Sequence, residues 1–197
     1  MRGNLFNIGV VSQVQGSSAN QGILDKVSGA DYAGSLRKLR AAYTGPVVEL
    51  EIQGGGSTDD FFDAGGGVLN NASGDTPTEW LTSLALPTNT GLRVRKLYNQ
   101  ATGGGQDIQQ TAIGLQPHIY QGGGADYYRI GTNNRITLHW DATDDALDHP
   151  SGWPGSPDTS VCVVQELLVT EPAHLLLNGV SSSYYAVVSS TGNATSN

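Results

Sequence analysis

The chain has 197 residues, of which 18 are acidic and 10 basic, giving a formal net charge of −8. A net-negative surface repels phosphate and therefore argues against nucleic acids and anionic membranes as partners. No stretch approaches the ~20 consecutive apolar residues of a membrane span. Glycine is abundant at 27 residues and charged residues make up only 14%, which favours tightly turning β-structure that packs against neighbours.

Residues 1–22 are polar and small except for an apolar patch that begins at Leu5. They are interpreted either as a disordered terminus or as an extended N-terminal arm that becomes ordered on a partner. In the second case Leu5, Phe6 and Ile8 are the candidate docking residues.

The stretch 23–45 predicts a helix over residues 31–43. Tyr32, Leu36, Leu39 and Tyr43 are spaced by four, three and four residues, which places them on one helix face. Gly45 and Pro46 are suited to end such a helix. We expect this helix to cover a sheet, with its arginine and lysine side chains in solvent.

A half-buried strand is predicted over 47–53, where apolar residues alternate with Glu49, Glu51 and Gln53. The following glycine-rich stretch, 54–67, is predicted to be a loop with three aspartates and two phenylalanines at its centre. Calcium binding and partner docking through Phe61 and Phe62 are the two hypotheses for this loop.

Thr76-Pro77-Thr78-Glu79 predicts a second, short helix, with Thr76 as its cap. The remaining chain alternates between short extended segments and turns. The predicted extended segments are 92–98, 106–112, 116–122, 126–131, 134–140, 160–169, 174–179 and 183–190.

These elements predict a mainly β protein, an antiparallel jelly-roll or concanavalin-like β-sandwich with one or two short helices. The domain is expected to occupy residues 23–190, followed by a flexible tail at 191–197. Residues 160–169 are its most apolar strand and contain the single cysteine, Cys162, which is interpreted as a buried thiol.

Chemically active side chains form one cluster, the aspartates of DATDDALD at 141–148. Such a cluster is typical of a turn, and less often of a calcium site, for which Asp141, Asp144 and Asp145 are the candidates. The four histidines lack zinc spacing and no other cofactor is indicated. No pair of carboxylates is spaced so as to identify a glycosidase site.

Three aromatic residues are candidates for a carbohydrate-binding surface. Trp153 stands between Gly152 and Pro154 in a predicted loop, and Tyr127 and Tyr128 are its candidate companions. The alternative is that Trp153 plugs one end of the sandwich.

Four segments follow one another in a specific order: YAGSLRKLRAAYTGPVVEL, LYNQATGGGQDIQQ, QPHIY and RITLHWDATDDAL. Together they resemble the start of the catalytic domain of fungal arabinofuranosidase B, and still more the version found in phage virion structural proteins. That family has a concanavalin A-like (LamG-type) β-sandwich.

The chain also departs from the family. The tryptophan-tyrosine-aspartate of the family motif is here Leu97-Tyr98-Asn99, the arginine-rich strand after the helix is acidic, and the bridging cysteines are missing. The resemblance therefore implies the fold and not the hydrolytic activity.

The expected function is that of a non-enzymatic structural protein of a tailed bacteriophage particle, located in the virion as a capsid decoration or a tail or fibre component. Its expected partners are other virion proteins and further copies of itself, with a cell-surface glycan as an additional candidate. The alternative is a carbohydrate-binding module or an arabinofuranosidase-like glycoside hydrolase relic.

Overall fold

The computed structural model describes residues 22–26, 29–30, 32–65, 68–88, 90–103, 105–120, 129–130, 135–136, 138–139, 144–148, 173–178, 183–188 and 194–196. These residues form a mainly β protein with few and short helices, as predicted. The helices are η1 (Ile23–Asp25), α1 (Pro77–Ser83) and η2 (Ile113–Leu115). The strands are β1 (Val48–Ile52), β2 (Thr58–Gly65), β3 (Val68–Asn71), β4 (Leu92–Leu97), β5 (Ile108–Gln109), β6 (His118–Tyr120), β7 (Arg129–Ile130), β8 (Arg135–Ile136), β9 (Ala173–Asn178), β10 (Ser183–Val188) and β11 (Ala194–Ser196).

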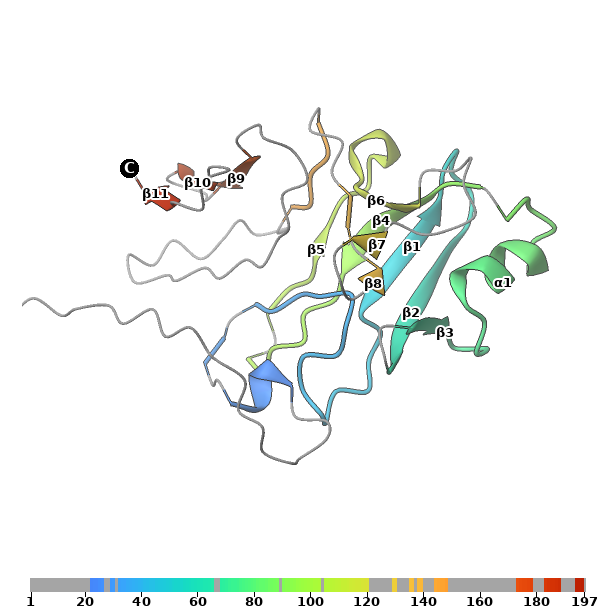
Figure 1. The fold of residues 1–197 in the computed structure, drawn as a ribbon, viewed down its shortest axis with the longest axis horizontal. Coiled ribbons are helices and arrows are strands. Elements are labelled where there is room, and N and C mark those ends of the chain that lie inside the picture. Colours follow the sequence, from blue (N-terminus) through green and yellow to red (C-terminus); the bar gives the residue numbers. More distant parts are fainter. Residues whose placement is uncertain are drawn as a thin grey trace, which may run out of the picture.

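The largest unit is a curled antiparallel sheet of six strands (Figure 1). Its order is β3-β2-β1-β4-β5, and β6 also pairs with β4. The central strands β1 and β4 confirm the two strands that alternation of apolar and polar residues predicted most clearly.

One face of this sheet carries the apolar core. Val48 and Leu50 of β1 are fully buried, as are Val94 of β4 and Phe61 of β2. Helix α1 packs on this core through Trp80, whose ring lies 5.6 Å from that of Phe61 in an edge-to-face arrangement.

The predicted start of α1 is confirmed. The Thr76 side chain accepts a hydrogen bond from the Glu79 N–H, and the Glu79 carboxylate accepts one from the Thr76 N–H at 2.8 Å. This reciprocal capping box satisfies two backbone donors at the helix start, and Pro77 fits the first helical position.

The helix predicted over 31–43 is wrong, because residues 32–45 form bends and turns. We call this segment the strap. It contains Gly34, which disfavours a helix, and isolated helices shorter than ~12–15 residues are marginal. Its backbone groups instead bond to other parts of the chain; the N–H of Leu39, for example, donates to Gln100 Oε1 at 2.7 Å.

The loop predicted over 54–67 is also wrong for most of its length. Among its described residues, Gly54, Gly55 and Gly56 form a turn, all three with positive φ, and Thr58–Gly65 then form β2. As a consequence, Phe61 is a fully buried core residue and is unavailable for docking. Phe62 is half-buried and, by the alternation of the strand, lies on the opposite face.

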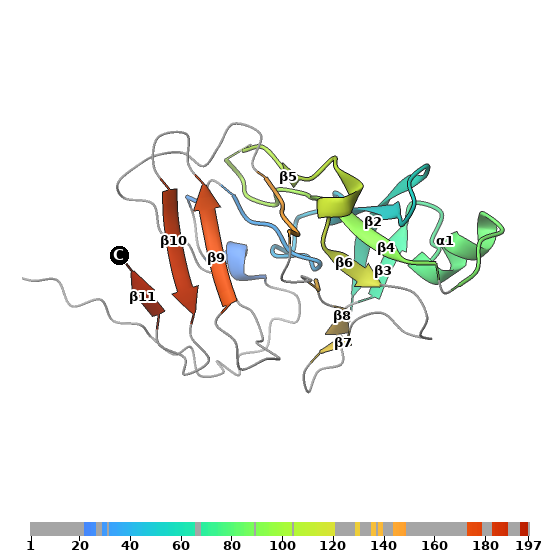
Figure 2. The same cartoon turned by 90° about the horizontal axis from the view of Figure 1, so that it is seen from above.

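The C-terminal part contains a three-stranded antiparallel sheet in the order β11-β10-β9 (Figure 2). The predicted hairpin of β9 and β10 is confirmed by the pairing of Ala173 to Asn178 with Ser183 to Val188. Within the predicted flexible tail, residues 194–196 instead form β11, which pairs with β10. The expected arm at 1–22, apart from residue 22, and the expected core strand at 160–169 lie outside the described residues.

Candidate functional site

The face of the sheet opposite the core is charged. Glu49 and Glu51 of β1 project to this face, together with Arg93 of β4. A β-bulge at Arg95 shifts the register between Glu49/Lys96 and Leu50/Val94. Arg95 and Lys96 therefore both reach the carboxylate of Glu49.

Ion pairs join the strands across this face. The Glu49 carboxylate contacts Arg95 at 2.5 Å and Lys96 at 3.1 Å, although Glu49 is only 7% exposed. The Glu51 carboxylate accepts a hydrogen bond from Gln116 Nε2 at 2.7 Å. These contacts engage both carboxylate oxygens of Glu49 and one of Glu51, so each glutamate is bound within the chain.

A second polar arrangement connects the strap to the residues that follow β4. The buried side chain of Gln100 accepts from the Leu39 N–H and donates to the carbonyl oxygens of Arg37 at 2.8 Å and Ser35 at 3.3 Å. Asn99 Oδ1 accepts from the N–H of Ala33 at 3.1 Å. The strap is thus fixed by side chains distant in sequence.

Carboxylates complete the attachment of the strap. Asp63 of β2 accepts from the Lys38 N–H, and Asp25 of η1 accepts from the Ala41 N–H, both at 2.8 Å. In addition, the N–H of Leu24 donates to the carbonyl of Leu39 at 2.9 Å. Segments 22–26, 58–65 and 97–100 therefore all hold the same strap.

Tyr98, which follows β4, contacts Asp60 of β2 and Lys96 of β4. Its hydroxyl donates to Asp60 Oδ1 at 2.6 Å, and Lys96 Nζ lies 4.9 Å from its ring centroid. Burial, and then the hydrogen bond to Asp60, raise the pKa of Tyr98 well above 10. Tyr98, Asn99 and Gln100 thus have structural roles in this chain.

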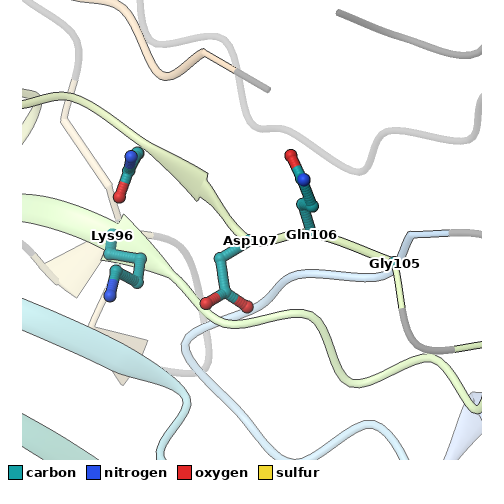
Figure 3. A pocket seen from close by; sticks show the side chains of 5 residues that line it. Lys96, Gly105, Gln106 and Asp107 are labelled. Carbon is teal, nitrogen blue, oxygen red and sulfur yellow. The ribbon is translucent and has the colours of Figure 1, made fainter. Parts of the chain in front are cut away.

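Two shallow, open hollows adjoin each other at Gln109. The larger, of about 340 Å³, is lined by Lys96, Gly105, Gln106, Asp107 and Gln109. Figure 3 shows the side chains of Gln106 and Asp107 pointing to opposite sides of their segment. The smaller hollow, of about 180 Å³, is lined by Gln109, Gln110, Thr111 and Asp148. Carboxylate and amide groups dominate both linings.

The predicted calcium ligands Asp144 and Asp145 differ in their exposure to solvent. The Asp145 side chain is 1% exposed and lies 4.0 Å from Arg93, whereas Asp144 is exposed and Asp141 lies outside the described residues. No group of three histidine, cysteine, aspartate or glutamate side chains in the described part is arranged to hold a metal ion. Calcium binding at 141–145 stays a prediction.

Sequence reasoning missed one close approach. His118 and His139 form an antiparallel bridge, with backbone N–H to O distances of 2.9 and 2.7 Å. Their spacing in sequence carries no signal of this contact.

The remaining predicted site residues cannot be placed. Tyr127, Tyr128 and Trp153, proposed for carbohydrate binding, lie outside the described residues, as do Leu5, Phe6 and Ile8 of the arm.

Comparison with known proteins gives no relative: no family model matches the chain, and no curated protein or solved structure shows a significant match. None of the helices within the described ranges is long and apolar enough to cross a membrane.

Proposed function

We propose that this chain is a non-enzymatic structural protein of a tailed bacteriophage particle, acting as a capsid decoration or a tail or fibre component. It acts by docking on neighbouring virion subunits, including further copies of itself. The six-stranded sheet is one layer of a jelly-roll or concanavalin-like sandwich.

The observation that carries this proposal is the contact between the two most distinctive segments of the family resemblance. Gln100, in the segment LYNQATGGGQDIQQ, makes its three side-chain hydrogen bonds to the strap, which lies in the segment YAGSLRKLRAAYTGPVVEL. Two segments separated by more than 50 residues in sequence are therefore parts of one structural unit.

The charged face supports a structural role over a hydrolytic one. A glycosidase needs two carboxylates that flank a substrate bond. Glu49 and Glu51 instead contact Arg95, Lys96 and Gln116, and the hollows beside them are shallow and open.

The proposal is tested by incorporation into particles. The full-length chain and a chain lacking residues 1–22 are supplied to phage particles that lack the protein, and purified particles are analysed by mass spectrometry. We expect the full-length chain to be incorporated and the shortened chain to be excluded while remaining folded. Absence of the full-length chain from particles contradicts the proposal, and unchanged incorporation of the shortened chain contradicts the docking role of the arm.

The alternative proposal is a carbohydrate-binding module or hydrolase relic. Glycan-array binding that is lost in Trp153→Ala would favour the binding module. Hydrolysis of aryl arabinofuranosides by the purified chain would contradict the non-enzymatic assignment.

A further inference from the structure

The strap is a basic surface on an acidic chain. It contains Arg37, Lys38 and Arg40 and no acidic residue, whereas the whole chain has a formal charge of −8. Arg37 and Lys38 are exposed, and Arg40 lies over the ring of Tyr43 at 5.6 Å. The strap therefore carries positive charge on a chain whose net charge is negative.

The cationic side chains of β4 and those of the strap differ in whether they form ion pairs. Arg93, Arg95 and Lys96 all lie within 4.0 Å of carboxylates of the same chain. Among the described residues, no ion pair engages Arg37 or Lys38. The carboxylates of Asp25 and Asp63 bind backbone N–H groups of the strap.

The strap holds these cations on a fixed backbone. Gln100 alone bonds three of its backbone groups, and this attachment leaves the Arg37 and Lys38 side chains in solvent. A backbone that is ordered before binding loses less conformational entropy on association than a mobile loop does.

A complementary surface lies on the same chain. The smaller hollow is lined by Asp148 with Gln109, Gln110 and Thr111. Asp148 is exposed, and no ion pair engages it in the described part of the chain. The exposed Asp148 carboxylate, with the Gln109 amide and the Thr111 hydroxyl beside it, provides acceptors for a guanidinium or ammonium group.

We propose that the strap of one copy docks, through Arg37 and Lys38, on the hollow at Asp148 of a second copy. The two surfaces are different, so the contact is head-to-tail and generates rings or chains of subunits. This inference deepens the proposed assembly role, on which it rests, by naming both sides of a contact between copies.

The test uses the purified full-length chain in sedimentation velocity at about 0.05 M and about 1 M salt, where the Debye length falls from more than 10 Å to about 3 Å. We expect oligomers at low salt that dissociate at high salt. A monomer at both salt concentrations, or oligomers that do not respond to salt, overturns the inference.

Charge exchange then identifies the residues. The double variant Arg37→Glu, Lys38→Glu and the variant Asp148→Lys should each associate at least about tenfold more weakly than the parent chain. A mixture of the two variants should recover association, because the new glutamates meet the new lysine and the unchanged strap meets the unchanged Asp148. Failure of the mixture to recover, or full association of either variant alone, overturns the assignment.

One control variant tests the effect of net charge alone. Ala72→Glu with Thr82→Glu adds two negative charges at exposed positions away from both surfaces and should leave association unchanged; weakened association would show that net charge alone is responsible and overturn the inference. Because purified protein is used, a negative result here does not alter the result for incorporation into particles.

Discussion

The side chain of Gln100 accepts a hydrogen bond from the backbone N–H of Leu39 at 2.7 Å, across 61 positions of sequence. Both partners lie away from the regular sheet, and Gln100 is fully buried. This single amide replaces hydrogen bonds that a helix would have made within residues 32–45.

Replacing Gln100 with alanine should destabilise the fold by about 2–4 kcal/mol, because buried backbone groups of the strap lose their partners. Urea unfolding measures the change. Hydrogen exchange should show faster exchange at the Leu39 amide.

The matched control is Gln116→Ala. Gln116 is also fully buried, but its amide bonds Glu51 and the carbonyl of Gln110. The Gln116→Ala variant should lose stability without a selective increase in hydrogen exchange at the Leu39 amide. Equal protection of Leu39 in both variants would contradict the role given to Gln100.

Phe61→Ala should cost about 3–5 kcal/mol, because it removes a fully buried ring that packs against Trp80. Phe62→Ala, on the half-buried face of the same strand, should cost clearly less. Thermal or urea unfolding of the two variants decides the matter, and a larger effect at Phe62 would contradict the placement of β2.

Thr76→Ala should cost about 1 kcal/mol through loss of the N-cap of α1. The backbone and side-chain hydrogen bonds from Thr76 lower the pKa of Glu79 below 4.5. A lowered pKa means that the contribution of Glu79 is present above its unfolded-state pKa and is lost as the pH falls through the folded-state pKa. NMR titration should find the pKa of Glu79 returning upward in Thr76→Ala.

Stability should decrease above about pH 10, the ordinary pKa of tyrosine. Burial and the hydrogen bond to Asp60 raise the pKa of Tyr98, so its contribution is complete below the unfolded-state pKa and is lost as the pH rises towards the folded-state pKa. Urea unfolding at pH 8 and at about pH 11 should show a smaller loss for Tyr98→Phe than for the parent chain. Burial also raises the pKa of Tyr32, so some loss should persist in the variant.

The sequence predicts those elements whose information is local. Strands β1 and β4 follow from alternation, and α1 follows from its cap, Pro77 and Glu79. Each depends on residues close together in the chain, where backbone periodicity determines which side chains face the core.

The strap and β2 could not be predicted in the same way. The apolar spacing of Tyr32, Leu36, Leu39 and Tyr43 fits a helix, but the hydrogen-bond partners that prevent it come from Asp63, Asn99 and Gln100. Likewise, β2 has a polar sequence, and its extended form depends on pairing with β1 and β3. Both outcomes are decided by tertiary contacts that local patterns do not contain.

The candidate site was predicted least well. Sequence reasoning located Glu49 and Glu51 on a strand but did not indicate that Arg95 would join them, because the bulge at Arg95 interrupts the alternation. It gave Asp144 and Asp145 one shared role, whereas the structure leaves Asp144 exposed and turns Asp145 towards Arg93.

The bulge at Arg95 also affects which single-residue deletions β4 can accept. The core residues of this strand are Leu92, Val94 and Leu97. Two residues separate Val94 from Leu97, whereas strict alternation allows one. Deleting Arg95 would restore an even spacing and keep all three apolar side chains on the same side. Deleting Lys96 would have the same effect on the spacing, and either deletion removes one of the two cations that contact Glu49. The strand can therefore lose one residue at the bulge and keep its apolar packing, but the deletion removes an ion pair with Glu49.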